Sequence, residues 1–359
     1  MAEKKQKVLV GMSGGVDSSV SAALLLEAGY EVIGAFMKNW SGGVEGPECK
    51  TPDRVGEEHE ECGWKQERRD AMRVAAKLGI PFLTFDFETE YRRDVVEYMF
   101  REFEAGRTPN PDVMCNRFVK FDLFVKEADK LGCDFVATGH YARVENGRIL
   151  MGSDPNKDQS YFLWAVPPSV LPRVLFPVGA MQKPEVREKA RQLGLSTAEK
   201  KDSVGICFVG EVNMKEFLQA RIPFSPGDIV TTEGKVVGRH DGLPFYTIGQ
   251  REGMGIGGGT PYYVIDKDRD KNQLIVSSAF HPKLFRDALT AHDPNWFRKP
   301  EIGTAIQARI RYRQPVAACE IIAFDPLTVK FKEPQRAVTP GQSIVFYDGE
   351  EMLGGAIIA

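Results

Sequence analysis

Short apolar runs alternate with amphipathic stretches along the first two hundred residues. Residues 7–10 are apolar after the first lysine, a glycine-rich turn follows, and the apolar stretch 20–28 then ends at Gly29. A short continuous apolar run is typical of a strand buried on both faces, and a longer one closed by glycine is typical of a helix. The pattern therefore predicts a strand, a turn and a helix in this order.

The same alternation continues downstream. Further strands are predicted at 31–38, 80–87 and 134–144, and further helices at 67–78, 89–103, 117–131 and 184–193. The stretch 67–78 has the spacing of an amphipathic helix, with Ala71, Val74 and Ala75 on one face. Strands that alternate with helices indicate an α/β fold with a parallel, doubly wound sheet.

The pattern changes near Asn213. Turn signals such as Gly227-Asp228 and Asp241-Gly242 become frequent, and the helical spacing is lost. We expect a catalytic domain at 1–210, a small mixed central domain at 211–282 and a C-terminal β-barrel at 283–359. The run 305–313 is predicted to be one of the barrel strands.

Composition narrows the function classes. The chain has 359 residues, 42% of them hydrophobic, and a net charge of −3. This length suits two or three domains, and the charge provides no global basic field, so any contact with nucleic acid must be local. No run is long enough to span a membrane and the first residues lack a signal-peptide core, so we expect a cytoplasmic protein. We also expect a monomer. Six cysteines in a chain of this length do not make a disulfide framework.

The turn after the first strand is the strongest candidate for chemistry. Its residues are Gly11, Met12, Ser13, Gly14, Gly15, Val16, Asp17, Ser18 and Ser19. Glycines let backbone amides converge, and serines in the first turn of a helix lie where the dipole and free amides favour phosphate. The Walker lysine is missing, so this is not the common P-loop. The alternative is a tight turn with capping serines.

The pattern S-G-G-x-D-S-S resembles the pyrophosphate loop of the ATP pyrophosphatases. The resemblance implies ATP cleavage between the α- and β-phosphates, with Mg²⁺ to neutralise charge. It also implies that Met37, at the end of the second strand, contacts adenine; the alternative is a core methionine. The strand predicted at 134–144 carries Gly139, and a glycine toward the C-terminal end of a parallel strand lets a ligand approach closely.

The polar insertion 40–66 is rich in glutamate and is expected to be a surface loop. Cys49, His59 and Cys62 fall in it, but they lack the C-x-x-C spacing and a fourth ligand. We therefore predict no metal site there.

Two cysteines lie in distinctive surroundings. Cys115 follows Asn110-Pro111-Asp112, and a helix starting at Asp112 would bring Asp112 and Cys115 to one side and lower the pKa of the thiol. Asp112 could also be only an N-cap. Cys207 follows Gly205-Ile206 in an apolar setting, where a buried inert cysteine is the default.

Taken together, the motifs resemble those of the bacterial tRNA-specific 2-thiouridylases, which make 2-thiouridine at the wobble position. The matching segments are 11–19, 110–115, 138–141, 157–160, 205–208, 309–313 and 340–342. The resemblance implies that Cys207 receives persulfide sulfur from a donor protein. It further implies that Cys115 resolves the persulfide or acts directly on the activated carbon, with Asp112 as general acid/base.

The same resemblance implies tRNA contacts by Asn110, Pro111, Asp112, His140, Lys157, Asp158, Gln159, Arg311, Tyr312 and Gln342. In addition, Arg309, Arg311 and Arg313 alternate, so a strand would point all three to one face, a row that suits phosphates. An exposed face kept soluble by arginine is an equal alternative.

Two rival functions stay open at the level of sequence. One is another adenylating amidotransferase or ligase of the same ATP superfamily, which would not need Cys115 and Cys207. The other is an RNA-binding scaffold with an inactive nucleotide loop, although Ser13, Gly14 and Asp17 are all intact.

Overall fold

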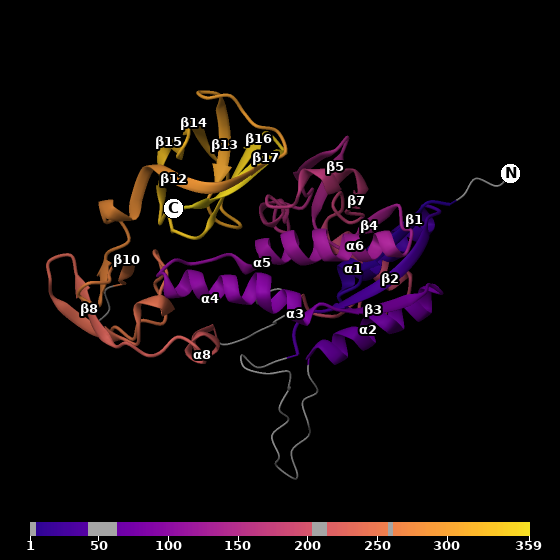
Figure 1. The fold of residues 1–359 in the computed structure, drawn as a ribbon, viewed down its shortest axis with the longest axis horizontal. Helices are drawn as coiled ribbons and strands as arrows, with labels where there is room; N and C mark the ends of the chain where they lie inside the picture. Colours follow the sequence, from indigo (N-terminus) through magenta and orange to yellow (C-terminus); the bar gives the residue numbers. More distant parts are fainter. Residues whose placement is uncertain (1–4, 42–62, 203–213, 258–260) are drawn as a thin grey trace, which may run out of the picture. The chain divides into compact units, whose positions relative to one another are not determined.

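The computed structural model describes residues 5–41, 63–202, 214–257 and 261–359 (Figure 1). It divides into two compact units. Unit 1 comprises Met1–Val96, Pro111–Val212 and Glu350–Met352, and unit 2 comprises Glu97–Asn110, Asn213–Gly349 and Leu353–Ala359. Residues 97–110 thus belong to unit 2, although they fall inside the range predicted for the catalytic domain.

Unit 1 is built on a five-stranded parallel sheet. Its strands are β1 (Lys7–Gly11), β2 (Glu31–Lys38), β3 (Phe82–Asp86), β4 (Phe135–Ala137) and β7 (Val174–Leu175). They lie in the order β3-β2-β1-β4-β7. After β1 the chain adds β2 and β3 on one side, and it then adds β4 and β7 on the other side of β1. The direction in which strands are added therefore reverses at β1. In such a sheet, ligands bind at the carboxyl ends of the strands at the point of reversal.

Helices cover both faces of this sheet, which confirms the predicted doubly wound α/β class. On one face α1 (Val16–Glu27), α2 (Gly63–Leu78) and α7 (Lys183–Gln192) share a core with the inward-facing residues of β1. On the other face, the ring of Phe124 in α6 (Phe124–Lys130) packs edge-on against Phe85 of β3. Figure 1 shows α2 and α6 on opposite sides of β1, β2 and β3.

Several predicted elements are interrupted. The helix expected at 89–103 is three segments: α3 (Glu88–Tyr91), the π-helical η1 (Arg92–Val96) and α4 (Glu97–Glu104). The helix expected at 117–131 begins earlier, as α5 (Pro111–Met114) and the π-helical η2 (Cys115–Leu123), and Phe121 has non-helical angles where η2 approaches α6. The strand expected at 134–144 divides into β4 and β5 (Ala142–Glu145), and β5 pairs with β6 (Arg148–Met151). The 3₁₀ turns η3 (Ser160–Phe162) and η4 (Pro168–Arg173) lead to β7.

Unit 2 contains a small mixed part. A four-stranded sheet has the order β10-β11-β8-β9. Its strands are β8 (Gly227–Thr231), β9 (Val236–His240), β10 (Tyr263–Asp268) and β11 (Gln273–Ser277), with α8 (Met214–Gln219) and η5 (Leu243–Phe245) beside them in sequence. Ile229, Val264 and Leu274 are fully buried in its core.

The rest of unit 2 is a closed six-stranded barrel, as predicted. After η6 (Pro282–Leu284), the strands are β12 (Phe285–Trp296), β13 (Ala305–Arg309), β14 (Ala317–Phe324), β15 (Leu327–Arg336), β16 (Ser343–Asp348) and β17 (Glu351–Ile358). They follow the order β12-β15-β14-β13-β16-β17, and β12 also pairs with β17, which closes the barrel. Within the described ranges, no helix combines the length and the apolar character that crossing a membrane requires.

Candidate functional site

The turn between β1 and α1 has the backbone that its glycines predict. Gly14 has a φ of +77°, and Gly15 precedes α1 without a side-chain cap. The amide of Ser13 donates to Ser18 Oγ over 3.2 Å, and Ser18 Oγ donates to the carbonyl of Gly15 over 3.2 Å. The first amides of α1 have no acceptor one turn back, so the turn presents donors of the kind that hold a phosphate.

Gly139 lets the end of the β4 segment touch the start of α1. A Cβ atom at Gly139 would lie 2.7 Å from the amide nitrogen of Ser18 and 3.1 Å from Asp17 Cβ. Sequence reasoning explained this glycine by the approach of a ligand; in the structure it accommodates protein backbone. Met37 similarly lies against Gly11, whose Cβ would be 3.0 Å from Met37 Cε, and it is buried. Its contact with adenine stays a prediction.

Asp17 is the centre of a partly buried ionic network that sequence reasoning missed. Lys183, the first residue of α7, donates from Nζ to both carboxylate oxygens of Asp17, over 2.7 and 2.8 Å. The hydroxyl of Tyr141 donates to Asp17 Oδ1 over 2.7 Å. The Lys183 side chain is only 10% exposed, so removing either charge would leave the other poorly solvated. The network fixes the carboxylate at the start of α1.

Asp202 extends the network on the far side of Lys183. Its carboxylate lies 2.9 Å from Lys183 Nζ and accepts hydrogen bonds of 2.7 Å from both Lys157 and Arg187. Burial acts to raise the pKa of Asp202, but the hydrogen bonds from Lys157 and Lys183 outweigh it and lower the pKa to about 2. Asp202 is therefore ionised at neutral pH and holds three cations together.

The predicted tRNA-contacting turn 157–159 is anchored to this network. Lys157 pairs with Asp202, as described above. Asp158 is buried and accepts from the amides of Gly152 and Ser160 over 3.0 and 3.1 Å. Gln159 Oε1 accepts from the amide of Tyr141 over 3.0 Å. The structure thus links this turn to Asp17 through Tyr141 and Asp202.

His140 is buried between aromatic rings. Its Nδ1 lies 2.6 Å from Thr138 Oγ1 and its Nε2 lies 3.5 Å from Lys120 Nζ. The rings of Phe121 and Phe176 flank it. Burial, reinforced by the charge of Lys120, holds the pKa of His140 well below its usual value, so the imidazole is neutral at pH 7. Its contact with tRNA stays a prediction.

Cys115 lies deeper than the sequence suggested. The helix starts at Pro111, so Cys115 is its fifth residue and is fully buried at the junction of α5 and η2. The helix thus begins one residue before the expected Asp112, and the reactivity of Cys115 stays a prediction. Asp112 is in the first turn of this helix. Cys207, and also Cys49, His59 and Cys62, lie outside the described residues.

Two buried amides near these elements have polar atoms without a hydrogen-bond partner. Asn39, directly after β2, is 1% exposed, and neither atom of its amide has a partner among the described residues. Asn116, next to Cys115, donates from Nδ2 to the carbonyl of Phe162 over 3.0 Å, but its Oδ1 has no partner in the described part of the chain. Such orphaned atoms are rare in proteins, and a bound ligand is one way to satisfy them.

The predicted row of three arginines does not form. β13 ends at Arg309, which is buried with its guanidinium over the ring of Tyr347. Arg311 donates from Nη2 to the carbonyls of Ile248 and Ala337, and to Thr339 Oγ1. Arg313 has a left-handed backbone, with φ of +62°, and lies over the ring of Tyr312. The three side chains do not share a strand face, because β13 ends at Arg309 and each arginine has a different partner.

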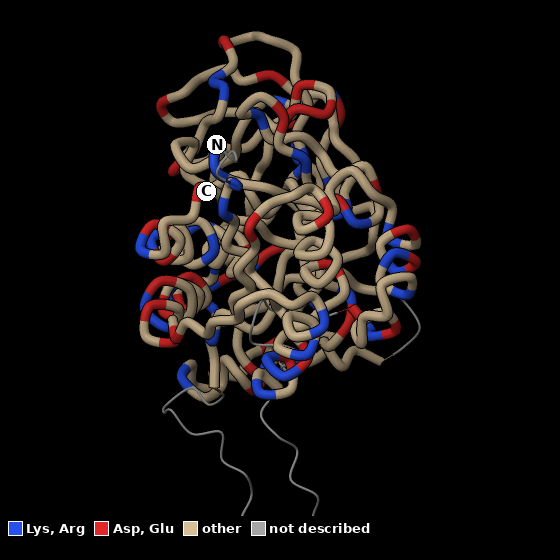
Figure 2. The backbone as a smooth tube through the Cα atoms, turned by 90° about the vertical axis from the view of Figure 1, so that its right-hand side faces the viewer, with Lys and Arg blue, Asp and Glu red and all other residues tan. Residues whose placement is uncertain are grey.

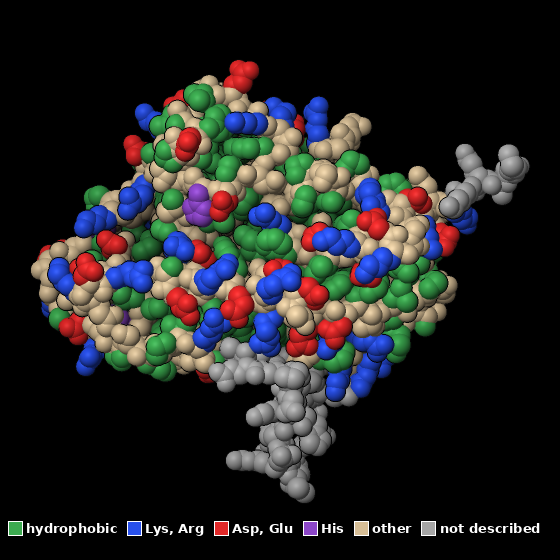
Figure 3. Space-filling view, in the orientation of Figure 1, with side chains coloured by type: hydrophobic (Ala, Val, Ile, Leu, Met, Phe, Trp, Pro, Cys, Tyr) green, Lys and Arg blue, Asp and Glu red, His purple; other side chains and the backbone are tan. Residues whose placement is uncertain are grey.

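Of the other predicted tRNA contacts, Asn110, Tyr312 and Gln342 lie in unit 2, and Pro111 and Asp112 begin α5 in unit 1. Gln342 donates from Nε2 to the carbonyls of Thr108 and Pro109, over 2.9 and 3.1 Å, and Asn110 next to them is buried. Figures 2 and 3 show basic and acidic residues interspersed in the views they draw, as the net charge of −3 leads one to expect. Contacts with RNA must therefore rest on local groups.

Tyr141, Lys183 and Asp202 could not be assigned from the sequence. Lys183 begins an ordinary amphipathic helix and is 166 residues from Asp17. The only sequence signal was that Tyr141 follows Gly139-His140 at the end of a strand, and that Asp202 precedes the segment containing Cys207.

Comparison with known proteins covers nearly the whole chain. Three family models match: the tRNA methyl transferase HUP domain at residues 6–211, the tRNA methyl transferase PRC-barrel domain at 215–278 and the aminomethyltransferase beta-barrel domain at 286–358.

Two relatives are named tRNA-specific 2-thiouridylase MnmA. The one from Bacillus licheniformis is 49% identical over 98% of this chain and 94% of its own length. The one from Pseudomonas fluorescens is 50% identical over 99% of this chain and 95% of its own length. Among solved structures, a 4-thiouridine synthetase in complex with RNA and ATP has a TM-score of 0.34 and 20% identity, covering 61% of this chain and 50% of that one, a likeness too weak to carry an argument.

Proposed function

The chain belongs to the tRNA-specific 2-thiouridylase family, and from that premise we propose that it replaces the C2 oxygen of the wobble uridine in tRNA with sulfur, at the cost of ATP. The observation that carries the proposal is the phosphate loop at the β1–α1 turn, whose Asp17 is held by Lys183 and Tyr141. Two of the family models have the words methyl transferase in their names, but the proposal stays thiolation. A loop that would bind ATP serves activation of the uridine by adenylation, and two cysteines serve sulfur transfer.

Activation is the first half of the proposed reaction. The C2 oxygen of uracil is a poor leaving group, and transfer of AMP from ATP onto it releases pyrophosphate and makes it a good one. The amides at the start of α1, with Ser13 and Ser18, would bind the phosphates, and Met37 and Gly139 would border the nucleotide.

Mg²⁺ fits this site through the loop carboxylate. Among the described residues, no group of three or more His, Cys, Asp or Glu side chains could form a metal cage. Mg²⁺ is commonly held by one or two carboxylates together with substrate phosphates and water, and Asp17 is the carboxylate at the loop. When bound, the ion would neutralise phosphate charge. Lys183 and Tyr141 would orient Asp17 toward that task.

Sulfur transfer is the second half. We propose that Cys207 carries the outer sulfur of a persulfide supplied by a donor protein. That sulfur attacks C2, AMP leaves with the former C2 oxygen, and Cys115 attacks the persulfide to leave a Cys115–Cys207 disulfide, which an external thiol must reduce. The alternative is that Cys115 acts directly on the activated carbon. Asp112 would transfer the proton.

We further propose that the catalytic domain spans 1–210 apart from residues 97–110, which belong to unit 2, and that the central and barrel domains span 211–282 and 283–359. We propose that the enzyme is cytoplasmic and monomeric. The candidate tRNA contacts are Asn110, Pro111, Asp112, His140, Lys157, Asp158, Gln159, Arg311, Tyr312 and Gln342. The links from Lys157 to Asp202 and from Gln159 to Tyr141 support the proposal, since they couple this turn to the loop carboxylate.

The test is nucleoside mass spectrometry of unmodified tRNA after incubation with enzyme, ATP, Mg²⁺ and a sulfide source, with AMP and pyrophosphate measured in parallel. We expect 2-thiouridine and AMP to form in equal amounts, and we expect no 2-thiouridine without ATP. Labelled persulfide should remain on Cys115→Ser and be absent from Cys207→Ser. AMP formation with an added small acid and without tRNA would favour the amidotransferase or ligase alternative. Tight tRNA binding without AMP would favour the scaffold.

A further inference from the structure

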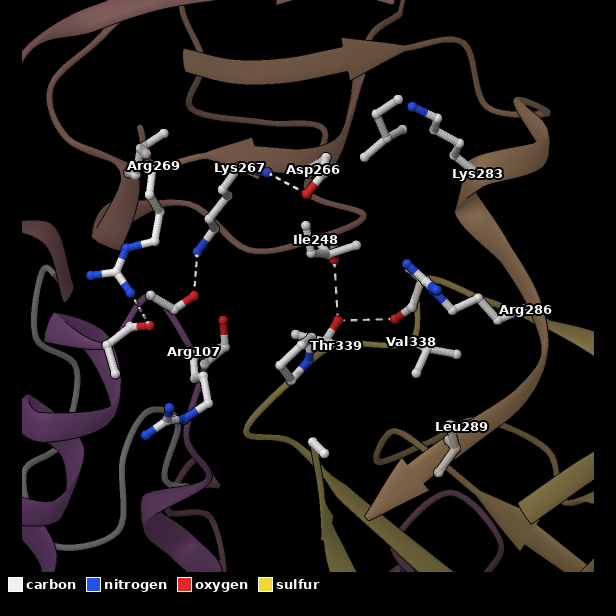
Figure 4. A pocket seen from close by; sticks show the side chains of 18 of the residues that line it. Arg107, Ile248, Asp266, Lys267, Arg269, Lys283, Arg286, Leu289, Val338 and Thr339 are labelled. Atoms are coloured by element: carbon white, nitrogen blue, oxygen red, sulfur yellow. Dashed lines mark hydrogen bonds between the residues drawn. The ribbon is translucent and has the colours of Figure 1, made fainter. Parts of the chain in front are cut away.

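A cavity of about 730 Å³ opens within unit 2, between the small mixed part and the barrel (Figure 4). One wall is the end of α4 with the turn that follows it. The others are β10, the start of β12 and the segment before β16. Every lining residue belongs to unit 2, and none belongs to the phosphate loop. The volume lies in the range that small organic ligands occupy, roughly 300–1,000 Å³.

The lining carries an excess of positive charge. Its cations are Arg107, Lys267, Arg269, Lys283 and Arg286, and its acids are Glu104 and Asp266. Arg107 is neutralised by a two-bond pair with Glu102, and Glu104 lies 3.9 Å from Arg221. In the described part of the chain, no carboxylate forms an ion pair with any of the other four cations.

Lys267 and Arg269 have a structural task, but it leaves most of the charge unexplained. They donate to the last carbonyls around the end of α4: Lys267 Nζ to Gly106 over 3.1 Å, and Arg269 to Ala105 over 2.9 Å. Cations are favourable at a helix C-terminus. Burial nevertheless lowers the pKa of Lys267 to about 8, with the charge of Arg269 adding to the effect. Capping of α4 thus explains where Lys267 lies, but it does not offset the free-energy cost of burying the ammonium charge.

Lys283 and Arg286 come from a different wall. Figure 4 shows them opposite Lys267 and Arg269 across the cavity, so cations border it on two sides. Neither helps to cap α4, and both are exposed. A bound anion would compensate cations on both walls at once.

Between the cations the lining combines apolar side chains with Asp266, which lies beside Lys267. Ile248, Leu289 and Val338 line the cavity, and Figure 4 shows Ile248 and Val338 between the Lys267 side and the Arg286 side, with Leu289 below Val338. The carbonyl oxygen of Ile248 and the hydroxyl of Thr339 lie among them. A matching ligand has a negatively charged group and a flat, largely apolar body with polar edges.

We propose that this cavity binds one nucleotide, with its phosphate between Lys267, Lys283 and Arg286 and its base against Ile248, Leu289 and Val338. A free nucleotide and one nucleotide of an RNA strand offer the same chemistry. The inference goes beyond the proposed thiolation and does not depend on it, because the cavity shares no residue with the loop that would bind ATP.

The test is photolabelling of the full chain with 8-azido-AMP, followed by mapping of the labelled peptides. We expect label in peptides from β10 and β12 in addition to any label near the β1–α1 turn. The double variant Lys283→Ala/Arg286→Ala should lose at least tenfold of the label in unit 2 and keep that at the turn. The matched control, Lys330→Ala/Lys332→Ala, removes two exposed lysines of β15 that do not line the cavity, and it should label like the wild type.

Competition identifies the class and source of the ligand. AMP should suppress the unit 2 label, whereas adenosine should not, because it lacks the phosphate. A short RNA that competes at tenfold lower concentration than AMP would assign the site to RNA, and competition by AMP alone would assign it to a free nucleotide. Absent unit 2 label, equal label in the Lys283/Arg286 variant, or equal competition by adenosine would overturn the proposal. Thiolation activity enters none of these outcomes.

Discussion

At the scale of single residues, the burial of the Asn39 side chain needs an explanation. A fully buried amide with no partner among the described residues costs stability, about 1–3 kcal/mol for each orphaned group, so a protein gains nothing by it unless a ligand uses it. Asn39 follows directly after β2, at the carboxyl edge where parallel sheets bind ligands. Its side chain is therefore a candidate for recognising nucleotide or base.

Replacing Asn39 with leucine should separate stability from function. The variant should be as stable as the wild type or more stable by about 1–2 kcal/mol, because the Asn39 side chain has no hydrogen bond to lose among the described residues. AMP formation should fall at least tenfold. Chemical denaturation and an AMP assay measure the two effects. The control is Thr197→Val, which removes an orphaned hydroxyl beyond the end of α7 and should leave activity intact. Full activity in Asn39→Leu would contradict a role of Asn39 in ligand recognition and would leave it a purely structural role.

Lys267 predicts a specific pH dependence. Its pKa is about 8 in the folded chain, against the usual value of 10.5 for an unburied lysine. Between these values the unfolded chain holds a proton that the folded chain has released, so stability rises as the pH rises from 8 to 10.5. The cost of burying the charge is fully present below pH 8 and is gone above 10.5. The size of this effect is roughly 3 kcal/mol.

The measurement is the unfolding free energy of the wild type and Lys267→Met across pH 7 to 10.5. Methionine does not titrate, so the wild type should gain about 3 kcal/mol relative to the variant over this range. All other titrations are shared and cancel in the difference. Parallel curves would mean that Lys267 has an ordinary pKa, and that its burial costs nothing.

At the scale of elements, the contact between α1 and the end of the β4 segment sets the geometry of the loop. An alanine at Gly139 would bring its Cβ 2.7 Å from the amide nitrogen of Ser18, closer than any ordinary contact, and the obstacle is backbone. The start of α1 must therefore shift. Gly139→Ala should lower stability by about 1–3 kcal/mol and weaken ATP binding at least tenfold.

Calorimetry with a non-hydrolysable ATP analogue, together with denaturation, checks this expectation. Gly63→Ala is the matched control, because a Cβ at Gly63 meets nothing within 4 Å and the residue opens α2 in the same unit. It should match the wild type in both measurements. Unchanged affinity in Gly139→Ala would show that the position of α1 does not govern binding.

The elements also show where sequence reasoning succeeds. The β1–α1 turn and the parallel, doubly wound class of the sheet were predictable, because local patterns specify them: apolar runs that alternate with helices, two glycines, and serines in the first turn of a helix. The strand predicted over 305–313 ends at Arg309 because Arg311 binds the carbonyls of Ile248 and Ala337, which the local alternation does not encode. The Asp17–Lys183 pair escaped prediction for the same reason. Long-range partners decide which charged side chains are structural.

At the scale of the whole molecule, α4 belongs with the later part of the chain. Phe100 is fully buried, its ring stacks on that of Phe217 at 5.5 Å, and the guanidinium of Arg221 lies over it at 5.0 Å. Arg221 also forms hydrogen bonds of 2.7 Å with both carboxylate oxygens of Glu97. A cut at residue 210 would separate α4 from both partners.

We therefore expect the fragment 1–210 to fold poorly by itself, although its sheet and loop are complete. Without residues 213–359, α4 would expose Phe100 and its neighbours, and an aromatic side chain of this kind buries roughly 150–250 Å². The isolated fragment should aggregate or bind a hydrophobic dye, and co-expression with 213–359 should restore a soluble complex.

Phe100→Ala should weaken that complex by about 3–5 kcal/mol, the usual cost of truncating a buried phenylalanine. Tyr98→Ala, on the same helix, is the comparison variant and should weaken it less. A monomeric 1–210 fragment as stable as the full chain would contradict the assignment of α4 to unit 2 and favour the domain boundary that the sequence predicts.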